Sequence, residues 1–231
     1  MSSAMNNIGI VKRNIVRADR AAVEKLSRFG VATIHEAMGR VGLMQPYMRP
    51  IYTNAQVCGT AVTVLLQPGD NWMLHVAPEV VQPGDVVVAA CTVENTDGFF
   101  GELLATSYRA RGAKGLIIEG GVRDVKEISE MQFPVFSRAI SARGTVKASL
   151  GSVNVPIVCA GVSVNPGDVV VADMDGVVIV PAAVAMAAAD ASEAREANEA
   201  DKRARLAKGE LGLDMYKMRE GLAKAGRKYI D

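Results

Sequence analysis

Aromatic residues are scarce in this chain of 231 residues: they make up 5% of it, and the formal net charge is only +1. Rows of stacking rings and strongly basic surfaces are typical of proteins that bind nucleic acids, and this composition supplies neither. A balanced charge also gives no reason to expect a membrane surface as partner. With 49% hydrophobic and 22% charged residues, the sequence indicates a soluble globular protein with a substantial core.

Cysteine is nearly absent as well. The three cysteines are odd in number, far apart and outside any CxxC spacing, which excludes a disulfide framework and a cysteine-based metal site. We expect buried thiols in a reducing cytoplasm. They are Cys58, Cys91 and Cys159.

Long apolar runs are missing too. Residues 1–14 lack the apolar core of a signal peptide. The uncharged windows 50–69 and 148–167 are interrupted by proline and glycine, so neither is expected to cross a membrane. The sequence therefore predicts a cytoplasmic protein.

Several common catalytic motifs are also lacking. GxGxxG, GxxxxGK[ST] and GxSxG do not occur. His35 is not part of an HExxH motif and His75 has no partner histidine, so both are expected to be structural. Known motifs for nucleotide binding, serine hydrolysis and histidine-based zinc binding therefore offer no lead.

The elements expected from periodicity are those of an α/β protein. Helices are expected over 18–30 and over 31–40, where Thr33 is a suitable N-cap with Glu36 three residues on. A short helix is expected between two Pro-Gly-Asp turns, and a longer one over 101–112. The apolar face of that longer helix would carry Leu103, Leu104, Ser107 and Tyr108. Strands are expected over 55–66, 83–89, 115–119, 155–164, 168–173 and 176–180.

The carboxy-terminal part has a different composition. Pro181, at the expected first helical position, opens an alanine-rich segment that becomes increasingly charged, with Arg195 and Glu199 spaced as an i,i+4 pair. A helix this polar cannot be buried all round. We expect an α/β catalytic domain over 1–181 and a helical extension over 182–231 that either lies on the surface or leaves the body to contact another subunit.

Two stretches carry candidate chemistry. In GLIIEGGVRD (115–124), an expected buried strand is followed by Gly120 and Gly121 and then, after Val122, by the adjacent charged residues Arg123 and Asp124. An adjacent charge pair is usually a surface ion pair. This pair follows a buried strand, where α/β sheets place ligands, and the glycines would let something approach the backbone.

The second stretch is GFFGELL (98–104), where Gly98 and Gly101 flank two phenylalanines and a helix begins near Gly101. The unpaired amides at a helix N-terminus suit an anion such as a carboxylate. Glu102 at this end would in any case favour the helix dipole. By itself this pattern is weak evidence for a site.

Together, the two stretches resemble a known family. Glu102, twenty intervening residues and then Arg123-Asp124 are similar to the motif of the 4-hydroxy-4-methyl-2-oxoglutarate / 4-carboxy-4-hydroxy-2-oxoadipate aldolases. These belong to the larger family named after the regulator of ribonuclease E activity A. Aspartate often holds the first motif position, so Glu102 departs from the pattern by one methylene. The resemblance covers residues 30 to about 180, and the carboxy-terminal arm resembles that of the aldolase branch.

The resemblance implies a layered β/β/α fold of the swivelling-domain kind, assembled as a homotrimer or a dimer of trimers. It also implies a class II aldolase that depends on Mg²⁺ or Mn²⁺. Backbone amides from Gly101 through Leu104 would hold the substrate carboxylate, Arg123 would contact the keto oxygen and Asp124 would ligate the metal. Glu102, and Glu199 from an adjacent subunit, would reach the metal through water.

The implied reaction releases pyruvate from small 2-oxo acids of aromatic-compound degradation, with oxaloacetate decarboxylation as a side activity. Stabilising the pyruvate enolate with a metal and a guanidinium is chemically consistent with this. The main alternative is a non-catalytic regulator of the ribonuclease E type, which is typically without the acidic residue after the arginine. A methyltransferase is a third alternative, but this sequence has no glycine-rich nucleotide loop to support it. A class I aldolase would need a lysine with a lowered pKa, for which Lys126 is the nearest candidate.

Overall fold

The structure is a computed structural model that describes residues 8–230, and its chain divides into two compact units. The first unit runs from Met1 to Ser192 and contains every strand of the described chain. The second runs from Glu193 to Asp231 and is helical in its described residues. The candidate site stretches both lie in the first unit.

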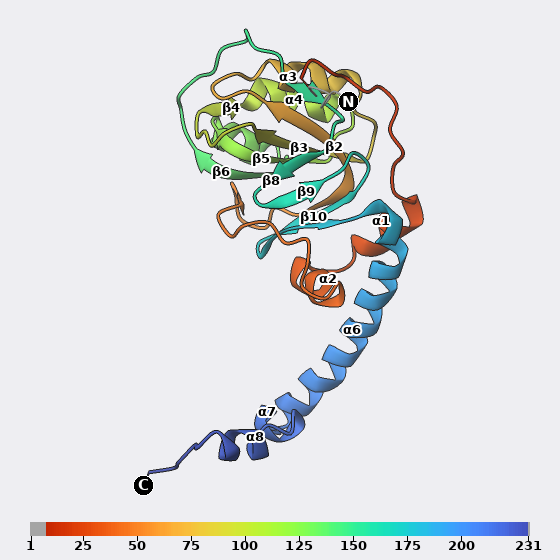
Figure 1. Ribbon diagram of the computed structural model, residues 1–231, viewed down its shortest axis with the longest axis vertical. Helices are drawn as coiled ribbons and strands as arrows, with labels where there is room; N and C mark the ends of the chain where they lie inside the picture. The colour runs from red at the N-terminus through yellow and green to blue at the C-terminus, as the bar shows by residue number, and fades with distance from the viewer. Residues whose placement is uncertain (1–7, 231) are drawn as a thin grey trace, which may run out of the picture. The chain divides into compact units, whose positions relative to one another are not determined.

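A mixed sheet forms the centre of the first unit (Figure 1). Its strands follow the order β1-β6-β5-β3-β2-β10-β11, with β4 paired to β5 and β7 paired to β2, while β8 and β9 form a separate hairpin. Neighbouring strands β2, β3, β5 and β6 are parallel, and β10 and β11 are antiparallel. The bounds are β1 (Arg49–Pro50), β2 (Val57–Leu66), β3 (Asp85–Cys91), β4 (Gly98–Phe100), β5 (Gly115–Val122), β6 (Val135–Ile140), β7 (Ser152–Val153), β8 (Ile157–Cys159), β9 (Val162–Val164), β10 (Val169–Asp173) and β11 (Gly176–Val180).

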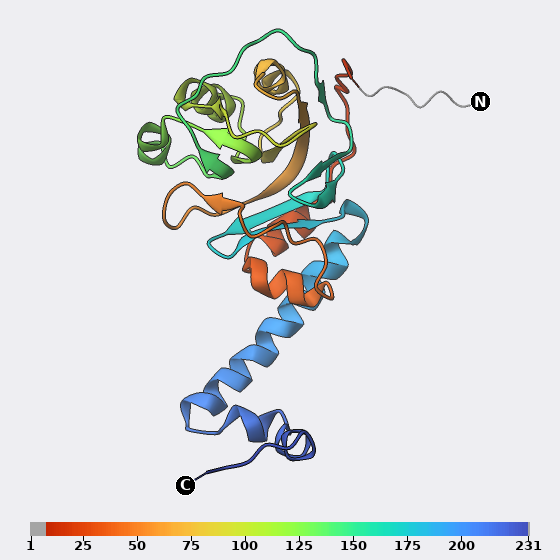
Figure 2. The same ribbon diagram turned by 60° about the vertical axis from the view of Figure 1, so that its left-hand side comes forward.

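Three apolar clusters separate the layers. One lies between β2, β3 and β5 and a group of helices, with Tyr108 fully buried in it. A second lies on the opposite face of these strands, where Ile117 of β5 joins side chains of β8, β10 and β11. A third packs other helices on the outer face of β10 and β11, so that the sheet curls over itself between two helical layers (Figure 2). The expected α/β fold of layered β/β/α type is confirmed.

The helices that were expected in the first unit lie near their expected positions, the helix Val125–Glu130 was not expected, and two expected details are wrong. Thr33 is not an N-cap: the cap of the second helix is Gly30, and the amide of Val31 donates to the Asp173 carboxylate (2.8 Å). On the helix that follows Gly101, Leu103 is 82% exposed and Ser107 is also exposed, because the buried face is shifted to Leu104, Ala105 and Tyr108. The helices are α1 (Arg20–Leu26), α2 (Val31–Ala37), α3 (Trp72–Val76), α4 (Glu102–Ala110) and α5 (Val125–Glu130), with the short 3-10 helix η1 (Ala77–Glu79).

The carboxy-terminal helix begins slightly later than expected. Pro181 precedes the 3-10 helix η2 (Ala182–Val184) as its N-cap, and α6 follows as Ala185–Ala207. The buried residues of α6 end at Ser192, which agrees with a helix that becomes too polar to be buried. In the second unit, two short helices follow, α7 (Gly212–Met215) and α8 (Arg219–Lys224).

The cysteines are free, as expected from their number and spacing. Cys58 and Cys159 are buried and Cys91 is half-buried, and all three are free thiols. Burial raises the pKa of the Cys58 thiol to about 11, consistent with an inert thiol. No helix in residues 8–230 combines the length and apolar character needed to cross a membrane.

Candidate functional site

The site is built where β5 ends and α4 begins. Strand β5 is longer than expected and continues through Gly120 and Gly121 to Val122. The next residue, Arg123, donates its amide hydrogen to the carbonyl of Phe100 (2.9 Å), the last residue of β4. This bond brings Arg123 and Asp124 next to Gly101, although about twenty residues separate the two segments along the chain.

Asp124 joins the two segments. Its Oδ2 accepts a hydrogen bond from the amide of Glu102 (3.0 Å), the first residue of α4. A Cβ atom on Gly101 would lie only 2.3 Å from the same oxygen, so glycine is required for this approach. The carboxylate therefore lies at the positive end of the α4 dipole, where negative charge is favoured.

The backbone at Asp124 is unusual. Its φ of 55° and ψ of 39° are left-handed, and it is the N-cap of α5. Aspartate and asparagine adopt this conformation more readily than most residues, because their short polar side chains can bond locally. The turn thus directs the Asp124 carboxylate back toward α4 instead of onward along the strand direction.

Arg123 and Asp124 are both accessible. Their side chains are 49% and 42% exposed, and Nε of Arg123 is 3.9 Å from Oδ2 of Asp124. That distance is beyond a hydrogen bond, so the pair is a loose one and the guanidinium donors can bind a ligand. A Cβ on Gly101 would also lie 3.3 Å from Cγ of Arg123, which places both charged residues against the start of α4.

Glu102 contributes its backbone amide to the site, whereas its side chain forms a hydrogen bond within α4. Its Oε1 accepts a hydrogen bond from the hydroxyl of Thr106 (2.7 Å), one turn further along α4. Its amide is engaged by Asp124, so the amides of Leu103 and Leu104 are the ones left in the first turn for a substrate carboxylate. The role of Glu102 at a metal, through water, stays a prediction.

The two glycines of β5, Gly120 and Gly121, were expected to let a ligand approach the backbone, but other parts of the chain approach it instead. A Cβ on Gly121 would lie 2.2 Å from the Thr96 carbonyl oxygen, and one on Gly120 would lie 3.0 Å from the ring of Phe99. Protein atoms therefore fill the space beside both glycines. They allow the segment before α4 to pack closely on β5, and it is Gly101 that leaves room at the site itself.

Glu119, which precedes these glycines, belongs to a structural network. Its carboxylate accepts hydrogen bonds from the Tyr47 hydroxyl (2.5 Å) and from the amide of Ala160 (2.6 Å), and it pairs with Arg138 (3.4 Å). Burial and the hydrogen bond to Glu119 raise the pKa of Tyr47 to about 12. This network ties β5 to the loop after β8 and leaves Glu119 committed to protein partners.

Sequence reasoning missed a neighbouring pair. Arg143 and Asp97 form an ion pair (Nε to Oδ1, 3.4 Å), and the carbonyl of Arg143 accepts a hydrogen bond from Gly98 (2.7 Å). Asn71 also contributes, because its side-chain amide donates to the Phe99 carbonyl (2.8 Å). No motif or periodicity marks the segment 141–151, so no local signal could have placed it here.

Glu199 lies in the second unit. There it pairs with Arg195 (2.8 Å) as the i,i+4 spacing predicts. Its contribution to the site from an adjacent subunit stays a prediction.

The donor chemistry of Asp124 fits a hard divalent cation. Oδ2 binds one amide, whereas Oδ1 has no hydrogen-bond partner among the described residues. Carboxylate oxygen is the ligand type that Mg²⁺ and Mn²⁺ prefer, and Mg²⁺ usually keeps several waters. Residues 8–230 contain no group of three or more His, Cys, Asp or Glu side chains that could hold a metal, so protein ligands from one chain would be few.

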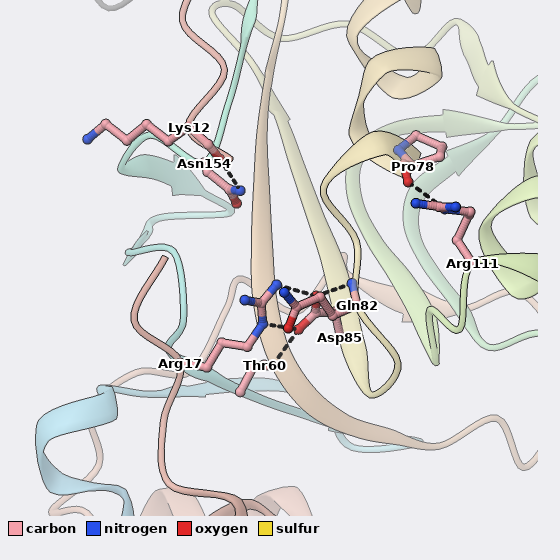
Figure 3. Close-up of polar contacts among 8 residues, drawn as sticks. All are labelled: Lys12, Arg17, Thr60, Pro78, Gln82, Asp85, Arg111 and Asn154. Atoms are coloured by element: carbon pink, nitrogen blue, oxygen red, sulfur yellow. Dashed lines mark hydrogen bonds and ion pairs between the residues drawn. The ribbon is translucent and has the colours of Figure 1, made fainter. Parts of the chain in front are cut away.

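Two cavities of the first unit lie elsewhere. Cavities of about 440 Å³ and 670 Å³ share Ser27 and Lys114 and open near the amino ends of β2, β3 and β5. Beside them, Asp85 accepts hydrogen bonds from Arg17 (2.8 and 2.7 Å) and Thr60 (2.6 Å), which ties the amino-terminal segment to β3 (Figure 3). The candidate site is at the opposite, carboxyl ends of these strands, where α/β sheets usually bind ligands.

Comparison with known proteins identifies the family of the chain. A family model described as "RraA-like: Aldolase/RraA" matches residues 31–179, which include both site segments. A protein of Halalkalibacterium halodurans named "Putative 4-hydroxy-4-methyl-2-oxoglutarate aldolase" is 32% identical over 148 residues, or 64% of this chain and 70% of that protein.

Solved structures share the fold. The crystal structure of an uncharacterized protein from Pseudomonas syringae has a TM-score of 0.73 at 25% identity and covers 85% of this chain and 97% of that one. The structure of Streptomyces coelicolor RraAS2, titled an unusual member of the RNase ES inhibitor RraA protein family, has a TM-score of 0.72 at 29% identity and covers 82% and 100%. Because the family model spans more than half of its residues, this chain belongs to the RraA-like family, Aldolase/RraA.

Proposed function

We propose that this chain is a divalent-metal-dependent aldolase that cleaves 4-hydroxy-2-oxo acids and releases pyruvate. The observation that carries the proposal is the convergence of three groups: the carboxylate of Asp124, the guanidinium of Arg123 and the amino end of α4. The related protein named as an aldolase supports the same reaction class.

Each group has a role in binding a 2-oxo acid. The amides of Leu103 and Leu104 would donate to the substrate carboxylate, since the first amides of a helix favour anions. Arg123 would donate to the C2 keto oxygen. When a water takes the proton of the 4-hydroxyl, C4 becomes a carbonyl, the C3–C4 bond breaks and its electron pair moves onto the pyruvyl half. Arg123 would stabilise the resulting enolate oxygen until a proton added at C3 gives pyruvate.

Asp124 would hold the metal, together with waters oriented by Glu102 and by Glu199 of an adjacent subunit. A bound Mg²⁺ or Mn²⁺ would supply a Lewis acid at the keto oxygen. Two features of Asp124 support this role: Oδ1 has no hydrogen-bond partner among the described residues, and the side chain is accessible.

Pyruvate release tests the proposal. The wild-type chain is incubated with 4-hydroxy-4-methyl-2-oxoglutarate or 4-carboxy-4-hydroxy-2-oxoadipate, with Mg²⁺ or Mn²⁺ and with a chelator. We expect cleavage only with metal, and metal-dependent decarboxylation of oxaloacetate, because both reactions pass through the pyruvate enolate. Cleavage that is unaffected by complete metal removal would contradict the proposal.

Asp124→Asn is the sharpest variant for this test. Asparagine tolerates the left-handed backbone at this position, so the fold is kept while the charge and one ligand oxygen are lost. We expect activity to fall at least about 100-fold, as for loss of a group that acts in the transition state. Asp124→Ala adds backbone strain and is the weaker choice. Arg111→Ala, at the far end of α4, is the control and is expected to stay active.

A binding regulator is the second candidate function. The RraAS2 structure, titled as a member of the RNase ES inhibitor RraA protein family, favours it. A regulator would require neither Asp124 nor metal for its effect. Inhibition of a ribonuclease E type enzyme by the wild-type chain and by Asp124→Asn alike, without pyruvate release by either, would favour this alternative.

A further inference from the structure

Arg143 lies beside the candidate site, although the proposed cleavage gives it no role. The segment 141–151 begins with a hydrogen bond from Ser141 to the carbonyl of Val122 (2.9 Å), which directly precedes Arg123. The Arg143 carbonyl then accepts from Gly98 (2.7 Å). A Cβ on Gly98 would lie 3.4 Å from Cβ of Arg123, so the backbones of the two arginines are close.

The side chain of Arg123 extends along the same segment. Its Nη1 is 3.5 Å from the position that a Cβ of Gly144 would take. Gly144, the residue after Arg143, therefore borders the guanidinium that would bind the keto oxygen. A substrate bound at Arg123 would meet this segment with the part of the molecule that lies beyond its pyruvyl half.

The guanidinium of Arg143 is loosely held. Its side chain is 81% exposed, and Nε is 3.4 Å from Oδ1 of Asp97. Strong charge-assisted pairs have distances of about 2.7–2.9 Å, so this pair is a long one. Arg138, in contrast, is 20% exposed and lies between Glu94 and Glu119. Arg143 can therefore turn to a ligand at little cost, while Arg138 cannot.

Substrates of the proposed class need such a group. Both substrates named for the proposed reaction, 4-hydroxy-4-methyl-2-oxoglutarate and 4-carboxy-4-hydroxy-2-oxoadipate, carry at least one carboxylate beyond the pyruvyl one. Planar bidentate binding by arginine is the usual way to recognise such a group. The other cation of the segment, Lys147, lies toward different groups: burial and then the charge of Lys147 lower the pKa of His75, and Lys147 also adds to the backbone hydrogen bonds that lower the pKa of Asp70.

We propose that Arg143 binds the second carboxylate of the substrate and makes the site selective for dicarboxylic over monocarboxylic 2-oxo acids. This inference rests on the proposed function. Asp97 would keep the Arg143 guanidinium near the site until a substrate carboxylate replaces or joins it.

The test compares two substrates that differ at the distal end. 4-Hydroxy-4-methyl-2-oxoglutarate carries the second carboxylate, and 4-hydroxy-2-oxopentanoate lacks it. For Arg143→Ala we expect kcat/KM to fall about 10- to 100-fold on the first and less than about twofold on the second, since a hydrogen bond to a charged group is lost only with the first. Arg143→Lys keeps the charge without the planar fork and is expected to lie in between.

The control is Arg111→Ala, which removes the same charge at the C-cap of α4, where Arg111 donates to the Pro78 carbonyl (2.9 Å; Figure 3). It is expected to change neither substrate's kcat/KM. Equal losses on both substrates with Arg143→Ala, or no loss on either, would overturn the inference and leave the aldolase proposal standing.

Binding separates the two proposals if the wild-type chain cleaves neither substrate. Titration with 2-oxoglutarate and 2-oxobutyrate, in the presence of Mn²⁺, then gives the preference directly. Tighter binding of 2-oxoglutarate that disappears in Arg143→Ala would support the role of Arg143 without the aldolase activity. Absence of that preference, or of any binding, would overturn both proposals.

Discussion

Gly101 determines the geometry of the site at the scale of single residues. Its φ of −142° and ψ of −174° are open to any residue, so its requirement does not come from the backbone. It comes from Asp124, whose Oδ2 would lie 2.3 Å from an added Cβ. The glycine therefore makes a direct contact possible between a carboxylate and the first turn of α4.

Gly101→Ala tests this contact. We expect the alanine to push the Asp124 carboxylate away, and a displacement on the order of 1 Å to lower activity about 100-fold. Pyruvate release and Mn²⁺ affinity by calorimetry are the measurements, and both are expected to weaken. Unchanged values for both would show that the close approach has no part in function.

Gly221→Ala is the matched control. A Cβ on Gly221 in α8 would meet nothing within 4 Å, and alanine favours helix. We expect full activity and a slight gain in stability, of about 0.5–1 kcal/mol at most. The pair of variants thus separates the loss of a glycine from the loss of room at Asp124.

At the scale of elements, Asp70 fixes the segment that carries Arg143. Its carboxylate is 2% exposed and accepts hydrogen bonds from the amides of Trp72 (2.8 Å), Ala148 (2.6 Å) and Ser149 (2.6 Å). Burial by itself would raise the pKa of Asp70, but these amides and Lys147 outweigh it, and the pKa is lowered from its ordinary value of 3.8. The ionised form is thus the one that the folded chain stabilises.

Asp70→Asn is expected to lower the free energy of unfolding at pH 7 by about 1–3 kcal/mol, since a buried network loses its charged acceptor. Because the folded pKa is below 3.8, the wild-type contribution is present above that pH and is lost as pH falls through the folded value. Urea unfolding at pH 7 and pH 3 measures this, and the difference between wild type and variant is expected to shrink at pH 3. A difference that grows in acid would refute the account, and faster hydrogen exchange at Ala148 and Ser149 would locate the change.

At the scale of the whole molecule, the prediction is a site shared between subunits. The family resemblance assigns Glu199 to a neighbouring subunit's metal, and the helix that carries it has no buried residue beyond Ser192. Its present partner is Arg195, at 2.8 Å with both side chains partly exposed. An exposed i,i+4 pair of this kind contributes only about 0.3–0.5 kcal/mol, so Glu199 can be replaced without loss of the fold.

Subunit mixing tests the shared site. Asp124→Asn and Glu199→Gln chains, each expected to be strongly impaired alone, are refolded together, and partial activity is expected to return because some sites combine both native residues. Sedimentation is expected to show a trimer or a dimer of trimers. A monomer, or a fully active Glu199→Gln chain, would rule out this sharing and leave Arg123 and Asp124 as the proposed centre.

The site residues were open to prediction from sequence to different degrees. Arg123 and Asp124 stand out because a buried strand, glycines and two charges are adjacent along the chain, whereas the expected role of Glu102 came only from the family resemblance. Arg143 and Asp70 do not stand out, since each belongs to a segment without periodicity. Gly120 and Gly121 were expected to leave room beside the site, but atoms of residues 96–99 fill the space next to them.

The sequence by itself determined most of the elements and their order, because apolar periodicity and turn residues act within a few positions of each other. It did not predict β4, β6 or α5. Only the tertiary structure decided which of these elements meet. The Asp173 carboxylate accepts a hydrogen bond from the first amide of α2, and the Asp124 carboxylate accepts one from the first amide of α4. The backbone of Arg143 lies beside Arg123. These contacts depend on strand register and on the left-handed turn at Asp124, and segments distant in sequence come within hydrogen-bonding distance only once the sheet has formed.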